Sequence, residues 1–320
     1  MKFILSLLLL IPSFAHAYKP EVGHSKILPL AHKLLQTCKL SAGDFYSEND
    51  IEIMKKASTG IDSGDVDFSP ETGKNPFSLW SRILNWHFYN GDMPNGETFL
   101  WFIEKSYKNT WSLLSQGYDN TENKTLKLTY LGGMAHFIED MANPAHVIPA
   151  FHMIGIKDGI DDFEPNHKTL LTRIKGKHLC NVLSENLVDS NPISIRDWAV
   201  KKTYKELEQK IPRCPDFRWS NFYDKAESGQ FFGDFHTNPS RATSTHNDQK
   251  YNRKTFYIGD EGKLVSNANS NLVCDFKSKD PRYNKFITQL FENAIIADAL
   301  LLISQQPFLN NKLSGAIDGR

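Results

Sequence analysis

Excess charge of one sign is absent from this sequence, which has 37 Lys and Arg residues against 37 Asp and Glu residues among 320. Without a net basic charge, the chain lacks the long-range field that helps proteins hold a polyanion, which weighs against a dedicated nucleic-acid-binding protein. The sequence also lacks a P-loop, a nucleophile elbow and a catalytic-cysteine signature. The forms of chemistry that depend on those three motifs are therefore not indicated.

Cysteine is scarce, with four residues at positions 38, 180, 214 and 274. None of them forms a C-x-x-C pair, so the sequence argues against a zinc site built on cysteine. An even number of cysteines in an exported chain predicts up to two disulfides. Three pairings are possible, and the sequence does not choose among them.

Long apolar runs are confined to the beginning of the chain. Lys2 is followed by an apolar run from Phe3 to Pro12 and by small residues up to Ala17. This pattern is typical of a secretory signal peptide with an A-x-A cleavage site at residues 15–17, and the run is shorter than the roughly 20 residues that span a bilayer. We therefore expect residues 1–17 to be removed, a mature chain that begins at Tyr18, and a soluble protein that is secreted or periplasmic.

Apolar residues recur at three- and four-residue steps along most of the mature chain, which predicts amphipathic helices. The predicted helical ranges are 24–40, 76–89, 96–116, 123–141, 168–187, 194–211 and 283–305. Residues 214–276 are instead rich in aromatic residues, Gly, Asn and Ser, which predicts an irregular, partly β insertion before the last helix. No internal repeat or low-complexity linker divides the chain. We expect residues 18–320 to form a single all-α domain.

The stretch HFIEDMANPAH, residues 136–146, concentrates histidines and carboxylates. His136 and Asp140 stand four residues apart and share a helix face, whereas Glu139 falls on another face, where we expect it to be solvated. Pro144 should end or kink the helix and turn His146 back towards the same region. Imidazole nitrogen and carboxylate oxygen suit zinc, although buried side chains satisfied by hydrogen bonds would give the same spacing.

Two earlier motifs offer further ligands. An α-amine at Tyr18 would lie six residues before His24, and its pKa of about 7.7–8.0 lets a metal ion displace the proton; otherwise His24 merely begins a helix. His87 follows an apolar helical stretch and would usually be a packed core histidine. The acidic segment GIDSGDVD, residues 60–67, could share a metal ion with His87 or could form a solvated loop or helix cap.

A later segment, KDGIDDFEPNH, places Glu164 directly before a helical stretch and 18 residues after His146. From that position Glu164 could reach back to the histidines, whereas Asp158 and Asp162 are expected to be solvated.

In their order along the chain, these motifs resemble those of the zinc-dependent phospholipase C and S1/P1 nuclease superfamily, and most closely the bacterial phospholipases C that hydrolyse phosphatidylcholine. The resemblance rests on Tyr18 at the mature N-terminus, on Gly23-His24, on His87-Phe88 and on the H-x-x-x-D motif followed by His146, and it runs to about Glu164. It implies a secreted, multi-helix protein that holds three zinc ions in a cleft. The family usually begins with Trp, and here the candidate is Tyr18.

The resemblance also implies a ligand set for each zinc ion. His87, His136 and Asp140 would hold one ion with an acid from residues 60–67, for which we choose Asp65, with Asp67 and Asp62 as alternatives. Tyr18 and His24 would hold a second ion, bridged to the first by Asp140.

The third ion would bind His146 and Glu164. Where the family has a histidine four residues before that glutamate, this chain has Ile160. His152 or Asp161 would have to substitute, so the third zinc site departs most from the family pattern.

The implied reaction is hydrolysis of a phosphoester by a zinc-activated water, with Asp65 and Asp140 as catalytic residues and no covalent enzyme intermediate. Balanced charge and 12% aromatic residues favour a phospholipid head group at a membrane surface over a polyanion. Aromatic residues in 216–223 and 230–235 could contact that surface, or could pack internally. We expect a monomer without stable membrane insertion that releases diacylglycerol and a phosphorylated head group. A single-strand nuclease and 3′-nucleotidase, or a non-catalytic protein that binds zinc or lipid, are the alternatives.

Overall fold

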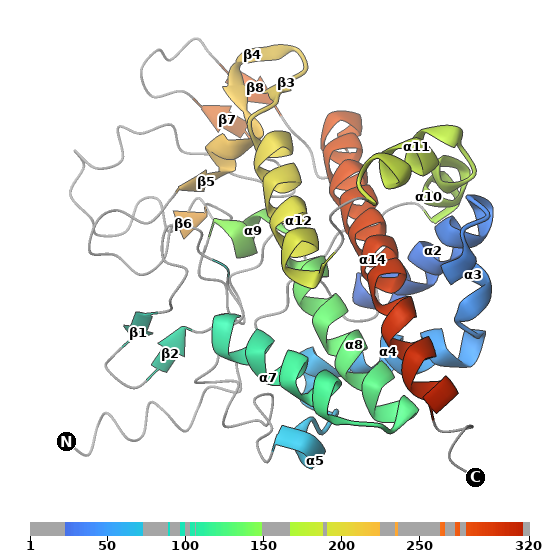
Figure 1. The fold of residues 1–320 in the computed structure, drawn as a ribbon. Coiled ribbons are helices and arrows are strands. Elements are labelled where there is room, and N and C mark those ends of the chain that lie inside the picture. Colours follow the sequence, from blue (N-terminus) through green and yellow to red (C-terminus); the bar gives the residue numbers. More distant parts are fainter. Residues whose placement is uncertain are drawn as a thin grey trace, which may run out of the picture.

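Helices dominate the part of the chain that the structure, a computed structural model, describes. The described residues are 23–72, 89, 97–99, 103–105, 107–148, 167–187, 191–224, 234–235, 263–265, 273–275 and 280–315. The expected signal peptide at residues 1–17 lies outside them. Over the described residues, the prediction of an all-α architecture is confirmed (Figure 1).

The described helices are α2 (His24–Thr37), α3 (Ser41–Phe45), α4 (Glu48–Ser63), α5 (Ser69–Thr72), α7 (Tyr107–Asn120), α8 (Lys124–Asp140), α9 (Pro144–Val147), α10 (His167–Ile174), α11 (Lys177–Glu185), α12 (Pro192–Leu207) and α14 (Pro281–Gly315). The predicted helix over residues 168–187 is divided into α10 and α11, and Gly176 caps the start of α11.

The described strands form short antiparallel pairs. They are β1 (Glu97–Phe99) with β2 (Ile103–Lys105), β3 (Lys210–Ile211) with β4 (Cys214–Arg218), β5 (Tyr223–Asp224) with β6 (Asp234–Phe235), and β7 (Lys263–Val265) with β8 (Val273–Asp275), and a 3₁₀ turn, η1, covers Trp219–Phe222. The last three pairs lie largely within residues 214–276, where a partly β insertion was predicted. The first pair contradicts the predicted helix over residues 96–116, since α7 begins only at Tyr107.

Helix α8 occupies the centre of the described core and packs along α4, α7 and α14. Every residue from Tyr130 to Asp140 is buried, so this part of α8 has no solvent-facing side. Gly132 permits the close approach to α4, because a Cβ at this position would lie 2.2 Å from the Met54 carbonyl oxygen and 2.8 Å from the Ala57 Cβ. The destabilising effect of glycine within a helix is thus offset by packing that no other residue allows.

Replacing Gly132 with alanine should lower the free energy of unfolding by about 1–3 kcal/mol, because the added methyl group meets backbone atoms of α4 that cannot rotate away. Denaturant titration of the variant measures this loss. Thr129→Ala, on the half-exposed side of the same helix, is the control and should change stability by only about 0.5 kcal/mol. A Gly132→Ala midpoint equal to that of the wild type would contradict the close packing.

The position of α4 is set by clear start and stop signals. The Ser47 side chain accepts a hydrogen bond from the Asp50 backbone N–H at 3.2 Å, and the Asp50 carboxylate accepts one from the Ser47 N–H at 3.0 Å. Gly64 ends the helix with a left-handed φ of 73°. Asp62 therefore stays in the last turn of α4, whereas Asp65 lies beyond the helix end.

The long helix α14 crosses the described core and contacts α2, α8, α11 and α12 (Figure 1). The stretch Pro281–Gln306 is long and apolar enough to cross a membrane by length and composition, but 89% of its most apolar window is buried inside the protein. We conclude that α14 is a core helix, which confirms the prediction for residues 283–305. A disulfide between Cys38, just after α2, and Cys180 in α11 ties two of its neighbours together.

Candidate metal centre

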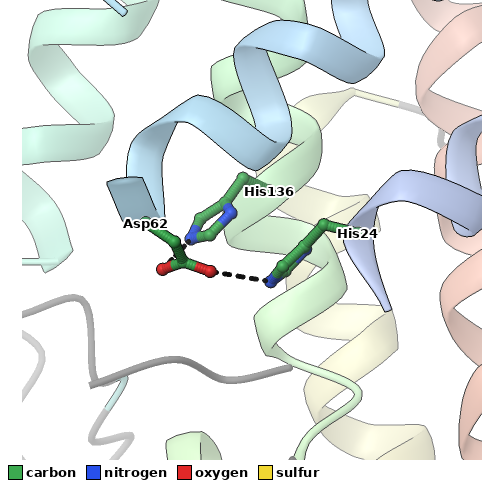
Figure 2. A group of neighbouring side chains, drawn as sticks. All are labelled: His24, Asp62 and His136. Carbon is green, nitrogen blue, oxygen red and sulfur yellow. Dashed lines mark ion pairs between the residues drawn. The ribbon is translucent and has the colours of Figure 1, made fainter. Parts of the chain in front are cut away.

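Three buried side chains from three helices meet near the end of α4. His24 begins α2, Asp62 lies in the last turn of α4, and His136 lies in the last part of α8, and all three are fully buried (Figure 2). The two rings are stacked with centroids 4.2 Å apart, and the Asp62 carboxylate faces their Nε2 atoms, with one oxygen 3.7 Å from His24 Nε2 and the other 3.8 Å from His136 Nε2. Their ligand atoms all lie within 4.8 Å of one another, as one metal ion requires.

Asp140 adds a second carboxylate to this group. One of its oxygens lies 3.6 Å from His24 Nε2, and the other lies 3.4 Å from His136 Nε2, one helical turn earlier. The second oxygen also lies 3.5 Å from His146 Nδ1. The two oxygens of Asp140 thus face different histidines, which places this carboxylate at the middle of the cluster.

His146 reaches the cluster because the chain turns sharply after α8. The Asn143 side chain accepts a hydrogen bond from the Ala145 N–H, and Pro144 occupies the first turn of the short helix α9. The predicted turn at Pro144 is therefore confirmed. Helix α12 braces this turn from outside: Thr203 donates a hydrogen bond to the Met141 carbonyl at 2.6 Å, and Tyr204 donates one to the Val147 carbonyl at 2.8 Å.

The spacing of these groups differs from that of ordinary hydrogen bonds. The five histidine–carboxylate pairs have nitrogen–oxygen separations of 3.4–3.8 Å, longer than the about 2.7–3.2 Å typical of N–H···O bonds. Ligand atoms held about 2.0–2.1 Å from a tetrahedral zinc ion lie about 3.4 Å from one another. The side chains are therefore spaced as ligands of a shared ion would be.

Negative charge is concentrated here in a core that excludes water. Burial acts to lower the pKa of His24, but the charge and hydrogen bond of Glu139, with the charge of Asp62, outweigh it and raise that pKa. Burial and then the negative charges of Asp62 and Glu139 raise the pKa of Asp140 well above its usual range. A divalent cation among these groups would remove the repulsion and favour the ionised carboxylates.

Glu139 is not solvated, contrary to its prediction as a bystander. It is fully buried, because α8 is enclosed on every side at this point, and its carboxylate contacts Nδ1 of His24. Ser58 of α4 donates a hydrogen bond to the same carboxylate oxygen at 2.9 Å. Glu139 therefore belongs to the surroundings of the cluster, on the far side of the His24 ring from Asp62 and Asp140.

The structure places Asp62 in the cluster and not Asp65, which the sequence prediction preferred. Asp65 and Asp67 are exposed, because Gly64 ends α4 before them and turns the chain away from the core. A glycine directly after a helical stretch is the sequence signal that could have selected Asp62.

Of the other predicted ligands, His24, His136, Asp140 and His146 are brought together. The remaining candidates lie outside the described residues: Tyr18, His87, His152, Asp161 and Glu164.

Compared with known proteins, the chain matches no family model, no curated protein and no solved structure. A role for the cluster must therefore be argued from its own residues, together with the resemblance of the sequence motifs.

Proposed function

We propose that the protein is a zinc-dependent phosphoester hydrolase of the phospholipase C type, with the multi-helix fold of that superfamily. The observation that carries the proposal is the set of five fully buried side chains with nitrogen–oxygen separations of 3.4–3.8 Å: His24, Asp62, His136, Asp140 and His146. A fold rarely buries two carboxylates beside three imidazoles unless a cation neutralises them.

The residue types favour zinc over the other common divalent ions. Calcium and magnesium prefer oxygen ligands, whereas three of the five groups here offer imidazole nitrogen. Zinc accepts histidine and aspartate together. When bound, zinc supplies Lewis acidity towards a phosphoryl oxygen and a water with a pKa near 7.

The chain itself supplies orientation and charge for this chemistry. His24 and His136 direct their Nε2 atoms, and His146 its Nδ1 atom, towards Asp140, so nitrogen and oxygen ligands converge. Asp140 turns one oxygen towards His24 and the other towards His136 and His146, an arrangement suited to joining two ions. Tyr18, His87 and Glu164, with His152 or Asp161, are the further ligands that the family resemblance implies for a total of three zinc ions.

We propose a glycerophospholipid such as phosphatidylcholine as the substrate, because a chain with balanced charge has no general attraction for a polyanion. Of the two roles left open for the aromatic residues of 216–223, contact with a membrane or internal packing, one residue takes the second. Trp219 is buried and stacks on Phe286 of α14, with ring centroids 4.4 Å apart. Any membrane contact must therefore be made by other residues.

Two aspartates three residues apart provide a matched test of the site. Asp62→Asn should lower the zinc content, and should lower phosphatidylcholine hydrolysis by more than the roughly 10–100-fold typical of losing an outer-shell partner, because a direct ligand loses its charge. Asp65→Asn, at an exposed position, should leave both unchanged. Zinc is measured by atomic spectroscopy on purified protein, and hydrolysis by the diacylglycerol released from phosphatidylcholine vesicles with and without chelator.

The same assay separates the alternatives. Zinc-dependent digestion of single-stranded DNA or RNA without diacylglycerol release would identify the nuclease instead. Stoichiometric zinc without hydrolysis of any phosphoester would identify a binding protein. A wild type that holds no zinc, or an Asp62→Asn variant as active as Asp65→Asn, would overturn the proposed function.

A further inference from the structure

Three helices place polar side chains on the Nδ1 side of the His24 ring, away from the metal centre. They are Ser58 of α4, Glu139 of α8 and Asp298 of α14, and each is fully buried. The Glu139 carboxylate contacts His24 Nδ1, and Ser58 donates its hydroxyl hydrogen to the same carboxylate. Asp298 lies close to Glu139, whose charge acts on it. We refer to Ser58, Glu139 and Asp298 as the outer cluster.

Glu139 and Asp140 are adjacent in sequence but serve different sides of the His24 ring. Successive residues of an α-helix are rotated by about 100°, so two neighbouring carboxylates cannot point the same way. Asp140 faces His24 Nε2 at 3.6 Å, whereas Glu139 contacts Nδ1. The ring is therefore held between two consecutive acidic side chains of α8.

The contact at Nδ1 determines what Nε2 can do. A neutral imidazole carries one N–H, and when Nδ1 donates it to a carboxylate, Nε2 is left with a lone pair. That lone pair is directed towards Asp62 and Asp140, where the ion is proposed to bind. Carboxylates that accept the remaining N–H of a ligand histidine are a common means of fixing ring orientation and raising ligand basicity.

Asp298 of α14 places a second fully buried acid beside Glu139. Burial, and then the charge of Glu139, raise the pKa of Asp298 well above its usual range. The Glu139 carboxylate itself accepts a hydrogen bond from Ser58 and contacts His24 Nδ1.

From these contacts we infer that Glu139, held by Ser58 and lying beside Asp298, is a positioning residue that orients His24 Nε2 towards the metal ion and thereby sets the affinity of the centre. The inference rests on the proposed function in so far as it requires His24 to bind a metal ion. It extends the centre beyond its ligands to α14, whose Asp298 lies 159 positions after Glu139 in the sequence.

The first test measures Zn²⁺ affinity by competition with a chromophoric chelator. Glu139→Gln should weaken binding by about 10–100-fold, since the charged acceptor at Nδ1 is lost. Asp298→Asn should weaken it by no more than about threefold, because the substitution leaves the Glu139 carboxylate in place at His24 Nδ1.

Glu292→Gln is the matched control. Glu292 lies on α14, six residues before Asp298, is almost as buried, and pairs with Arg173. Its loss should lower stability but leave Zn²⁺ affinity unchanged. Wild-type affinity in Glu139→Gln, or equal weakening in Glu292→Gln, would overturn the inference while leaving the proposed function intact. A wild type that binds no Zn²⁺ overturns both.

The second test needs neither a variant nor metal. A pH series of ¹⁵N spectra of the histidine rings in metal-free wild type reports which nitrogen of His24 keeps its hydrogen once the ring is neutral. The inference requires the hydrogen on Nδ1. A neutral ring with its hydrogen on Nε2 would show that Glu139 does not set the orientation of His24, whatever the variants do.

Discussion

Replacing Asp140 with asparagine should lower Zn²⁺ affinity by about 10³-fold or more and abolish hydrolysis of phosphatidylcholine. The substitution keeps the shape of the side chain but removes the charge from the group that lies among His24, His136 and His146. The expected loss exceeds the roughly 10–100-fold seen for outer-shell partners, because a ligand facing three others is changed directly. Isothermal titration of metal-free protein with Zn²⁺, together with diacylglycerol release, measures both effects.

In the metal-free protein, by contrast, Asp140→Asn should increase the stability of the fold. Burial and the charges of Asp62 and Glu139 raise the pKa of Asp140 in the folded protein. The contribution of Asp140 to stability is therefore present below its unfolded pKa of about 3.9 and is lost as the pH rises through its folded pKa. Asparagine does not ionise, so it does not lose stability in this way as the pH rises. In chelator near pH 8, Asp140→Asn should therefore melt at a higher temperature than the wild type.

A control for both measurements is Glu206→Gln on α12, a largely buried carboxyl outside the centre whose pKa burial also raises. It should bind Zn²⁺ as the wild type does. Retention of wild-type affinity in Asp140→Asn, or a lower melting temperature in chelator, would contradict the placement of Asp140 among charged groups of the centre.

Removing the Cys38–Cys180 disulfide should lower the free energy of unfolding by about 2–5 kcal/mol. The bond joins residues 142 positions apart, and the chain-entropy account gives about 5 kcal/mol for a loop of this length. Because the bond ties the end of α2 to α11, its loss mainly enlarges the conformational freedom of the unfolded chain. Guanidinium titration of a Cys38→Ser/Cys180→Ser variant against the oxidised wild type measures the difference.

For the disulfide, the informative control is chemical. Reduction of the wild type should shift its unfolding midpoint at least as far as the double variant does, since it breaks the Cys38–Cys180 bond and also the disulfide of Cys214. A double variant whose midpoint equals that of the oxidised protein would show that the closed loop contributes nothing to stability.

The sequence was most informative where neighbouring residues alone decide the geometry. The four-residue spacing of His136 and Asp140, and the proline before His146, sufficed to predict that these side chains meet. The apolar periodicity of residues 283–305 likewise sufficed to predict α14. Residues 97–99 and 103–105 form strands where the sequence predicts helix, because the apolar run from Phe99 to Ile103 is continuous and a short continuous run does not distinguish helix from strand.

The remaining errors concern partners that are distant in sequence. Glu139 was expected to be solvated because its own helix gave it a separate face, but α2 and α14 cover that face, and their positions depend on the whole fold. The sequence does not predict a role for Asp298, because a single acid within an apolar helix has no local pattern. Its partner lies on another helix, and spacing within α14 cannot indicate it.

The contact between Asp298 and Glu139 has a consequence for the order in which the protein can mature. Ser58, Glu139 and the histidines belong to the first half of the chain, whereas α14 is the last helix described and is synthesised after all of them. His24 therefore lacks its complete support until α14 has docked. Metal capture should therefore be tightest only in molecules in which α14 is packed against α8.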